Sequence, residues 1–138
     1  MKEITVIVPN RIGALAEVTD QLGKNGINIK SLSVQGIGDH GVLRFLTSDE
    51  LTAMTVLTRY IHGKSEYEVR LNDVMTVNLP DRPGELAKLT KRISKIGVNI
   101  ESVYQIGSAN GTTELVIRPE ELDPVVEELR RQGVKVRV

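Results

Sequence analysis

The sequence predicts an α+β protein made of two tandem ferredoxin-like βαββαβ modules, each an antiparallel sheet with two helices on one face. Two observations support this. Residues 8–31 (VPNRIGALAEVTDQLGKNGINIKS) align without gaps on residues 79–102 (LPDRPGELAKLTKRISKIGVNIES), with 11 of 24 positions identical. Strand and helix patterns also follow in the same order in both copies. Such a repeat indicates a duplicated unit, so we divide the chain into module 1–71 and module 72–138.

Each copy begins with a strand, because apolar residues alternate in residues 4–8 and again in residues 75–79. A polar turn follows, and then an apolar stripe with helical spacing. Gly26 and Gly97 stand where these helices should end, since glycine readily adopts the left-handed conformation. The expected stripes are Ile12, Leu15, Thr19 and Leu22 in the first copy, and Leu86, Leu89, Ile93 and Ile96 in the second.

The next two segments of each copy have strand patterns. Residues 27–35 (INIKSLSVQ) and 98–106 (VNIESVYQI) are the expected second strands. After a one-residue gap, GVLRFL at 41–46 aligns with GTTELV at 111–116 as the third strand. In this topology the second strand lies at a sheet edge, and a long apolar edge invites pairing. We therefore expect modules to pack side by side, within the chain or between chains.

A second helix and a short last strand complete each copy. The helix is expected to begin near Ser48 and Asp49 in the first copy and near Pro119 in the second, because these residues favour helix starts. Glycines close both helices, and EYEVRL and VKVRV follow as strands. Only residues 71–73 separate the copies.

Composition excludes several classes of function. Eighteen basic residues balance eighteen acidic ones, and each half is separately balanced, so neither half suits nucleic-acid binding. No apolar run approaches the roughly 20 residues that span a membrane. There is no cysteine, which removes disulfides and thiolate metal sites. We expect a cytoplasmic protein without metal or cofactor.

Catalytic residue patterns are also absent. The two histidines, His40 and His62, have no partner pattern, and no nucleophile motif is present. GIGDHG at 36–41 matches the dinucleotide fingerprint G-x-G-x-x-G, but the extended run VLRFLT follows it instead of a helix. We interpret this segment, and IGSANG in the second copy, as flexible connections between strands. No catalytic residue is predicted.

The loop and helix starts PNRIGALA and PDRPGELA, with the strand starts GINI and GVNI, resemble the ACT domain family. The resemblance covers nearly the whole chain twice and is greatest to stand-alone tandem ACT proteins, which carry no catalytic domain. It implies a free amino acid as ligand, bound between adjacent modules where the loop glycine meets the start of a neighbouring second strand. It also implies a homodimer and, as a partner, an enzyme of amino-acid metabolism.

The chemistry of these residues is compatible with that ligand. A helix N-terminus offers unpaired N–H groups to a carboxylate, and a glycine leaves space for the approach. Side-chain oxygens of Asn10 and Asp81 suit an ammonium group. The candidate ligand-binding residues are Asn10, Arg11, Ile12, Gly13, Ala14, Leu15, Asn28 and Ile29, with Asp81, Arg82, Pro83, Gly84, Glu85, Leu86, Asn99 and Ile100 in the second copy.

Other interpretations of the same residues remain open. Asn10 and Asp81 also suit a turn or helix-capping role, and the arginines after them suit surface ion pairs. Asn28 and Asn99 also suit a role as simple strand starts. Ile12 stands where the second copy has the expected proline, Pro83, so the two sites need not be equivalent. At the level of the protein, the alternative is an interaction module that acts on a partner enzyme without a ligand. A small enzyme ranks third.

Overall fold

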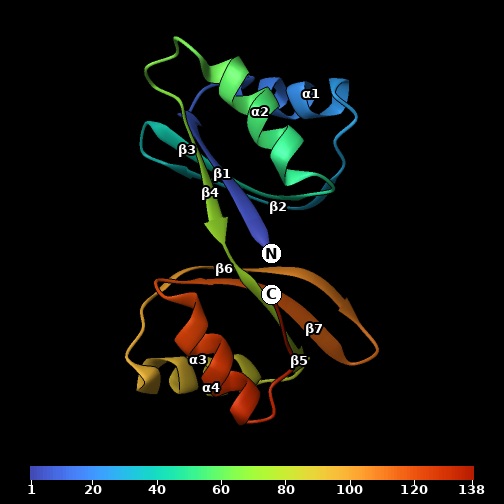
Figure 1. Ribbon diagram of the computed structural model, residues 1–138, viewed down its shortest axis with the longest axis vertical. Coiled ribbons are helices and arrows are strands. Elements are labelled where there is room, and N and C mark those ends of the chain that lie inside the picture. Colours follow the sequence, from blue (N-terminus) through green and yellow to red (C-terminus); the bar gives the residue numbers. More distant parts are fainter. The chain divides into compact units, whose positions relative to one another are not determined.

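A computed structural model describes all residues, 1–138, as two compact units. One unit is Lys2–Asn72, the first module; the other is Asp73–Val138 together with Met1, the second module. Each contains strand, helix, strand, strand, helix, strand in that order. In each module the two helices lie on one face of the sheet (Figure 1). The predicted fold class is confirmed.

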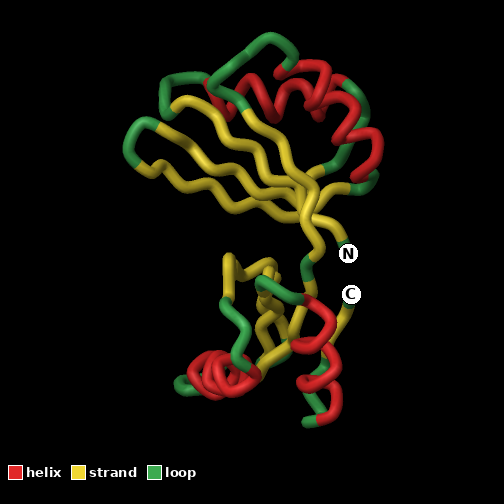
Figure 2. The backbone as a smooth tube through the Cα atoms, turned by 60° about the vertical axis from the view of Figure 1, so that its left-hand side comes forward, coloured by secondary structure: helices red, strands yellow, loops and turns green.

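The first module has a four-stranded sheet in the order β2-β3-β1-β4. Strand β3 is antiparallel to both of its neighbours, and β2 forms one edge, as expected. The tube in Figure 2 shows this sheet with its helices gathered on one side. The elements are β1 (Lys2–Pro9), α1 (Ala14–Lys24), β2 (Ile29–Ile37), β3 (His40–Thr47), α2 (Glu50–Ile61) and β4 (Glu68–Asp73).

The second module repeats this topology with the strand order β6-β7-β5-β8. Its last strand is only two residues long, whereas β4 has six. The amide of Val74, a fully buried residue between β4 and β5, donates to the carbonyl of Met1 at 3.0 Å. The elements are β5 (Met75–Pro80), α3 (Glu85–Ile96), β6 (Ile100–Ala109), β7 (Thr112–Pro119), α4 (Leu122–Arg131) and β8 (Val136–Arg137).

Each module has its own apolar core between sheet and helices. In the first, the alternating residues of β1 meet Phe45 of β3 and Leu22 of α1, all with almost no exposed surface. Ile117 and Ile93 take the corresponding places in the second. Burial of such side chains is the main favourable term in folding.

The predicted helix stripes are partly wrong. Ile12 is fully exposed and lies before α1, and Leu15 is 38% exposed. The buried face of α1 is instead Ala14, Val18 and Leu22. In the second module Leu86 is 49% exposed, although Leu89 and Ile93 are buried as expected. Both errors arose at the helix start, where an apolar residue continues the helical spacing but faces away from the core.

The predicted register of the third strands is also wrong. Ile4 pairs with Phe45, and its counterpart Met75 pairs with Ile117, so the third strands correspond with an offset of 72 residues. The sequence alignment placed them at an offset of 70. A bulge between Gln105 and Gly107 adds one residue to β6. The second copy has therefore gained a residue within a strand.

The two glycine-rich connections join the second and third strands, as predicted, through tight turns. Ile37 pairs with His40 and Ala109 pairs with Thr112, which leaves two residues in each turn. In the second turn Asn110 and Gly111 have φ of 54° and 75°, as type I′ hairpins require. GIGDHG therefore joins two strands, and the rejection of a dinucleotide fingerprint is confirmed.

The start of the second helix is predicted correctly in one copy only. Asp49 caps α2, accepting from the amide of Thr52 at 3.1 Å. Pro119, by contrast, ends β7, and α4 begins at Leu122. Residues 71–73, expected as a separator, belong to strand β4, so no loop joins the copies there.

Candidate functional site

The loop between the first strand and the first helix has the same backbone in both modules. Gly13 and Gly84 precede the helices with φ, ψ of 87°, −9° and 88°, −14°. This left-handed conformation favours glycine. No side chain caps either helix. The amides of Ala14 and Glu85 donate to the carbonyls of Arg11 and Arg82 at 3.3 and 3.4 Å, so the later N–H groups of the first turn are the ones available to water or a ligand. The difference between Ile12 and Pro83 leaves the backbone unchanged.

Asn10 and Asp81 do not cap the helices, so that interpretation is wrong. Both hold the loop to the hairpin that ends the edge strand. The amide of Asn10 donates to Asp39 at 2.8 Å, and its side-chain Nδ2 donates to the carbonyl of Gly38 at 3.0 Å. In the second module Ser108 donates its hydroxyl to the carboxylate of Asp81 at 3.0 Å.

Arg11 belongs to a network that joins four segments of the first module. Its guanidinium lies 3.1 Å from the carboxylate of Glu17 on α1 and donates to the Tyr67 hydroxyl at 2.8 Å. Tyr60, on α2, donates to the same carboxylate at 2.7 Å. The two tyrosine rings pack edge to face, 6.0 Å between centroids. We call Arg11, Glu17, Tyr60 and Tyr67 the arginine–tyrosine network.

The network shifts the protonation equilibria of its members. The Tyr60 hydrogen bond, followed by that from Arg11, holds the pKa of Glu17 below its ordinary 4.5. Burial, with the hydrogen bond to Glu17, raises the pKa of Tyr60. Glu17 therefore stays ionised, and the tyrosine keeps the proton with which it donates.

Arg82 has a simpler environment. Its Nε donates to Glu85 at 2.9 Å, and Glu85 also lies 3.4 Å from the ammonium of Lys88. The hydrogen bond from Arg82 holds the pKa of Glu85 below its ordinary value. Glu85 takes the place of the buried Ala14, and its side chain is 12% exposed. The terminal nitrogens of Arg82 have no protein partner.

Asn28 and Ile29 lie at the opposite end of the sheet from Asn10. Ile29 pairs with Thr47, whereas Asn10 adjoins the far end of β2 near Ile37 and His40. Eight residue steps of about 3.3 Å separate the two ends, roughly 26 Å. Asn99 and Ile100 begin β6 in the same way. One module therefore cannot bring both groups of candidate residues together, and a joint site needs two modules.

A family profile described as the ACT domain pair matches residues 1–131. The chain belongs to this family. The structure is similar to that of protein BT0572 from Bacteroides thetaiotaomicron, with 33% identity over 99% of this chain and 90% of that one, TM-score 0.85. No curated protein matches.

Two further structures share the fold. The regulatory subunit of aspartate kinase from Thermus thermophilus, in a ligand-free form, has 18% identity and TM-score 0.67, covering 94% of this chain and 91% of that one. The subunit from Thermus flavus has 20% identity and TM-score 0.70, covering 96% and 92%. Both likenesses concern the fold of the paired ACT modules.

Apolar side chains surround the loop of the first ACT module. Ile12 and Leu15 are exposed there, and Leu86 is exposed in the second module. The edge strand β2 also exposes Leu32 and Val34, by 44% and 45%. No helix covers them, although they point to the same face as the core residues of β3.

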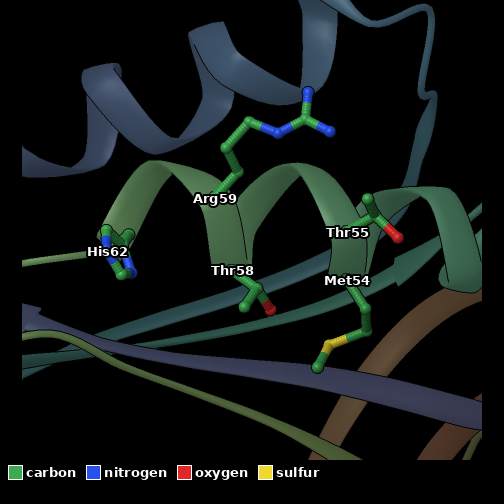
Figure 3. A pocket seen from close by; sticks show the side chains of 5 residues that line it. All are labelled: Met54, Thr55, Thr58, Arg59 and His62. Atoms are coloured by element: carbon green, nitrogen blue, oxygen red, sulfur yellow. The ribbon is translucent and has the colours of Figure 1, made fainter.

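A surface depression of about 640 Å³ lies elsewhere in the first ACT module. Five residues of α2 line it: Met54, Thr55, Thr58, Arg59 and His62. Figure 3 shows that these side chains diverge, with Arg59 reaching toward α1 and Met54 toward the sheet. The Thr55 hydroxyl is already bonded to the Leu51 carbonyl at 3.1 Å. The depression is no convergent binding site.

The chain has neither a cluster of metal ligands nor a helix that could span a membrane. No group of three or more His, Cys, Asp or Glu residues could hold a metal ion. No helix has the length and apolar character that crossing a membrane requires.

Sequence reasoning missed several residues that position the loops. Gly36 leaves space for Asn10, because a Cβ there would stand 3.0 Å from its Nδ2. Ser108 occupies the corresponding position in the second module and holds Asp81. Tyr60 and Tyr67 reach the loop from 49 and 56 positions beyond Arg11 in the chain. The sequence offered one signal for this network: the chain has only four aromatic residues, and two of them, Tyr60 and Tyr67, belong to it.

Proposed function

We propose that this chain is a non-catalytic regulatory protein that binds a free amino acid at an interface between ACT modules. The main support is the pair of uncapped helix starts, each beside a polar loop that a left-handed glycine leaves open. Amide donors there suit a carboxylate. Asn10 and Asp81 each retain a side-chain oxygen that suits an ammonium group.

Edge-strand pairing would complete such a site. If β2 of one module paired antiparallel with the edge strand of another, the start of one strand would lie beside the end of the other. Asn28 or Asn99 would then face a loop from the neighbouring module. Burial of Leu32 and Val34 would favour the pairing. The module pairs could form within one chain or across a homodimer.

The partner we propose is an enzyme of amino-acid metabolism in the cytoplasm. The two Thermus proteins of the same fold are regulatory subunits of aspartate kinase. Binding of an amino acid would stabilise one arrangement of modules, and the enzyme would respond to that arrangement.

Thermal denaturation with each protein amino acid in turn tests the ligand. An amino acid present at 100 times its Kd adds about 2.7 kcal/mol to stability. A rise in Tm with one or a few amino acids, reproduced by titration calorimetry, is the expected result. If no amino acid changes Tm and calorimetry is silent, the proposal is wrong.

The exposed β2 edge supports a second candidate, an interaction module that needs no ligand. Such a protein would keep its enzyme partner in buffer free of amino acids and would show the same affinity when they are added. A regulatory sensor would instead change its affinity for the enzyme as the amino acid is titrated.

A further inference from the structure

The two loops share a backbone but differ in chemistry. We propose that only the loop of the second module holds the charged groups of the amino acid, with Asp81 receiving the ammonium and Arg82 the carboxylate. The first loop is then a structural counterpart. This inference rests on the proposed function and specifies which residues of this chain perform it.

Asn10 and Asp81 have different neighbours and offer different acceptors. The strand pairing places Gly36 and Ser108 at equivalent positions, opposite Gly41 and Thr113. Asn10 lies over a glycine, and Asp81 accepts from a serine through Oδ2 at 3.0 Å. The other Asp81 oxygen has no protein partner, so a fixed, charged acceptor faces solvent. Asn10 offers only a neutral one.

Arg11 and Arg82 differ in which guanidinium nitrogens are already engaged. The arginine–tyrosine network engages both terminal nitrogens of Arg11, one with Glu17 and Tyr67 and the other with Ile12 and Glu17. Arg82 is held only at Nε, by Glu85. Its two terminal nitrogens remain available, and their geometry matches a carboxylate in a bidentate contact.

Together these contacts define the ligand class. On this proposal the free Asp81 oxygen and the free Arg82 nitrogens would face one ligand, and a molecule with both an ammonium and a carboxylate would gain two charge-assisted hydrogen bonds. Such bonds are roughly twice as strong as neutral ones. The second loop therefore selects α-amino acids with both groups free. Peptide termini or acylated amino acids satisfy only one of the two.

The test compares matched variants of the two loops. The amino acid that raises the Tm of the wild-type protein most is the probe for calorimetry. D81N and R82Q should each weaken its binding about tenfold or more, the usual scale for losing a charged partner. N10A and R11Q are the corresponding changes in the first loop. Each should change Kd by less than about twofold if only the second loop holds the charged groups, whereas use of both loops predicts losses like those of D81N and R82Q. Stoichiometry should be one per chain.

Ligand derivatives test the assignment of the two charges. The N-acetyl derivative of the probe should bind wild-type protein weakly, and D81N should add little further loss. The carboxamide derivative should behave in the same way with R82Q. Ser108→Ala should weaken binding a few-fold by releasing Asp81, and Ser108→Thr should restore it because the hydroxyl is kept.

The outcomes separate the two proposals. If wild-type protein binds no amino acid, the proposed function and this inference both fail. If it binds, but N10A or R11Q loses as much affinity as D81N, only the assignment to the second loop is overturned. Two equal sites per chain would overturn it as well. Retained Tm of the unliganded variants shows that they fold.

Discussion

The loops of the two modules show how a duplicated unit diverges without changing its backbone. In the first, Arg11 joins the loop to α1, α2 and the segment before β4 through the arginine–tyrosine network. In the second, Arg82 contacts only Glu85, three residues away. The backbone angles at Gly13 and Gly84 are nevertheless nearly identical. The side-chain contacts that anchor a loop can therefore differ while the backbone of the loop stays the same.

The largest effect should come from the cores, and it tests whether the modules are separate units. Phe45→Ala should cost the first module about 3–5 kcal/mol, because the buried ring leaves a cavity. Amide exchange should accelerate in β1 and β3 while β5 and β7 keep their protection. Ile117→Ala in the second module is the matched control and should reverse the pattern. Equal acceleration in both modules would show one cooperative unit.

The loop glycines should respond equally, which tests the shared backbone. Gly13→Ala and Gly84→Ala should each cost about 1–2 kcal/mol, the penalty for a left-handed alanine. Neither new Cβ meets an atom within 4 Å, so strain is the sole cause. Chemical denaturation measures both. A clear difference between the two variants would mean that the loops are not the same structure.

The arginine–tyrosine network should contribute less, and only to the first module. Tyr60→Phe removes the hydroxyl that donates to Glu17 and should cost roughly 1 kcal/mol, the net value of one hydrogen bond. Exchange of amides in α1 and in the loop should accelerate. Arg82→Gln offers the comparison, with no expected change outside the start of α3. Unchanged exchange in Tyr60→Phe would show that the network does not hold the loop.

The smallest effect is on pH dependence. The pKa of Glu17 lies below 4.5 in the folded protein, so the unfolded chain takes up the proton first as pH falls. The stabilisation is present above about pH 4.5 and is lost as pH falls through the lower, folded-state pKa. Glu17→Gln should flatten this decline in the first module. Glu85→Gln should do so in the second, as amide exchange resolved by module can show.

Much of the fold can be predicted from local sequence patterns. Alternation in residues 4–8, together with the repeated order of elements, predicts the topology and the exposed β2 edge. The positions of Gly13 and Gly84 follow from the motif around them. The predicted buried stripe was wrong at Ile12 and Leu15. The spacing of apolar residues continues across the start of the helix, but these two side chains are exposed.

Contacts between distant parts of the chain were beyond sequence reasoning. No pattern pairs Asp81 with Ser108, because they are 27 positions apart in the chain with a bulge between them. The extra residue in β6 changes the correspondence between the third strands of the two modules, so an alignment that relies on apolar residues alone misplaces them. The role of Arg11 likewise depends on Tyr60 and Tyr67, whose positions near it only the folded module reveals.

The hydrogen bond from Val74 to Met1 affects how the repeat can be dissected. Met1 supplies an acceptor to the second module, so the boundary of the sequence repeat is not the boundary in the fold. A polypeptide of residues 73–138 would lose this acceptor, and the amide of Val74, now the second residue of the chain, would bond to water instead. Recovering the intact module would require a residue in the place of Met1, which is not a chain neighbour of Asp73.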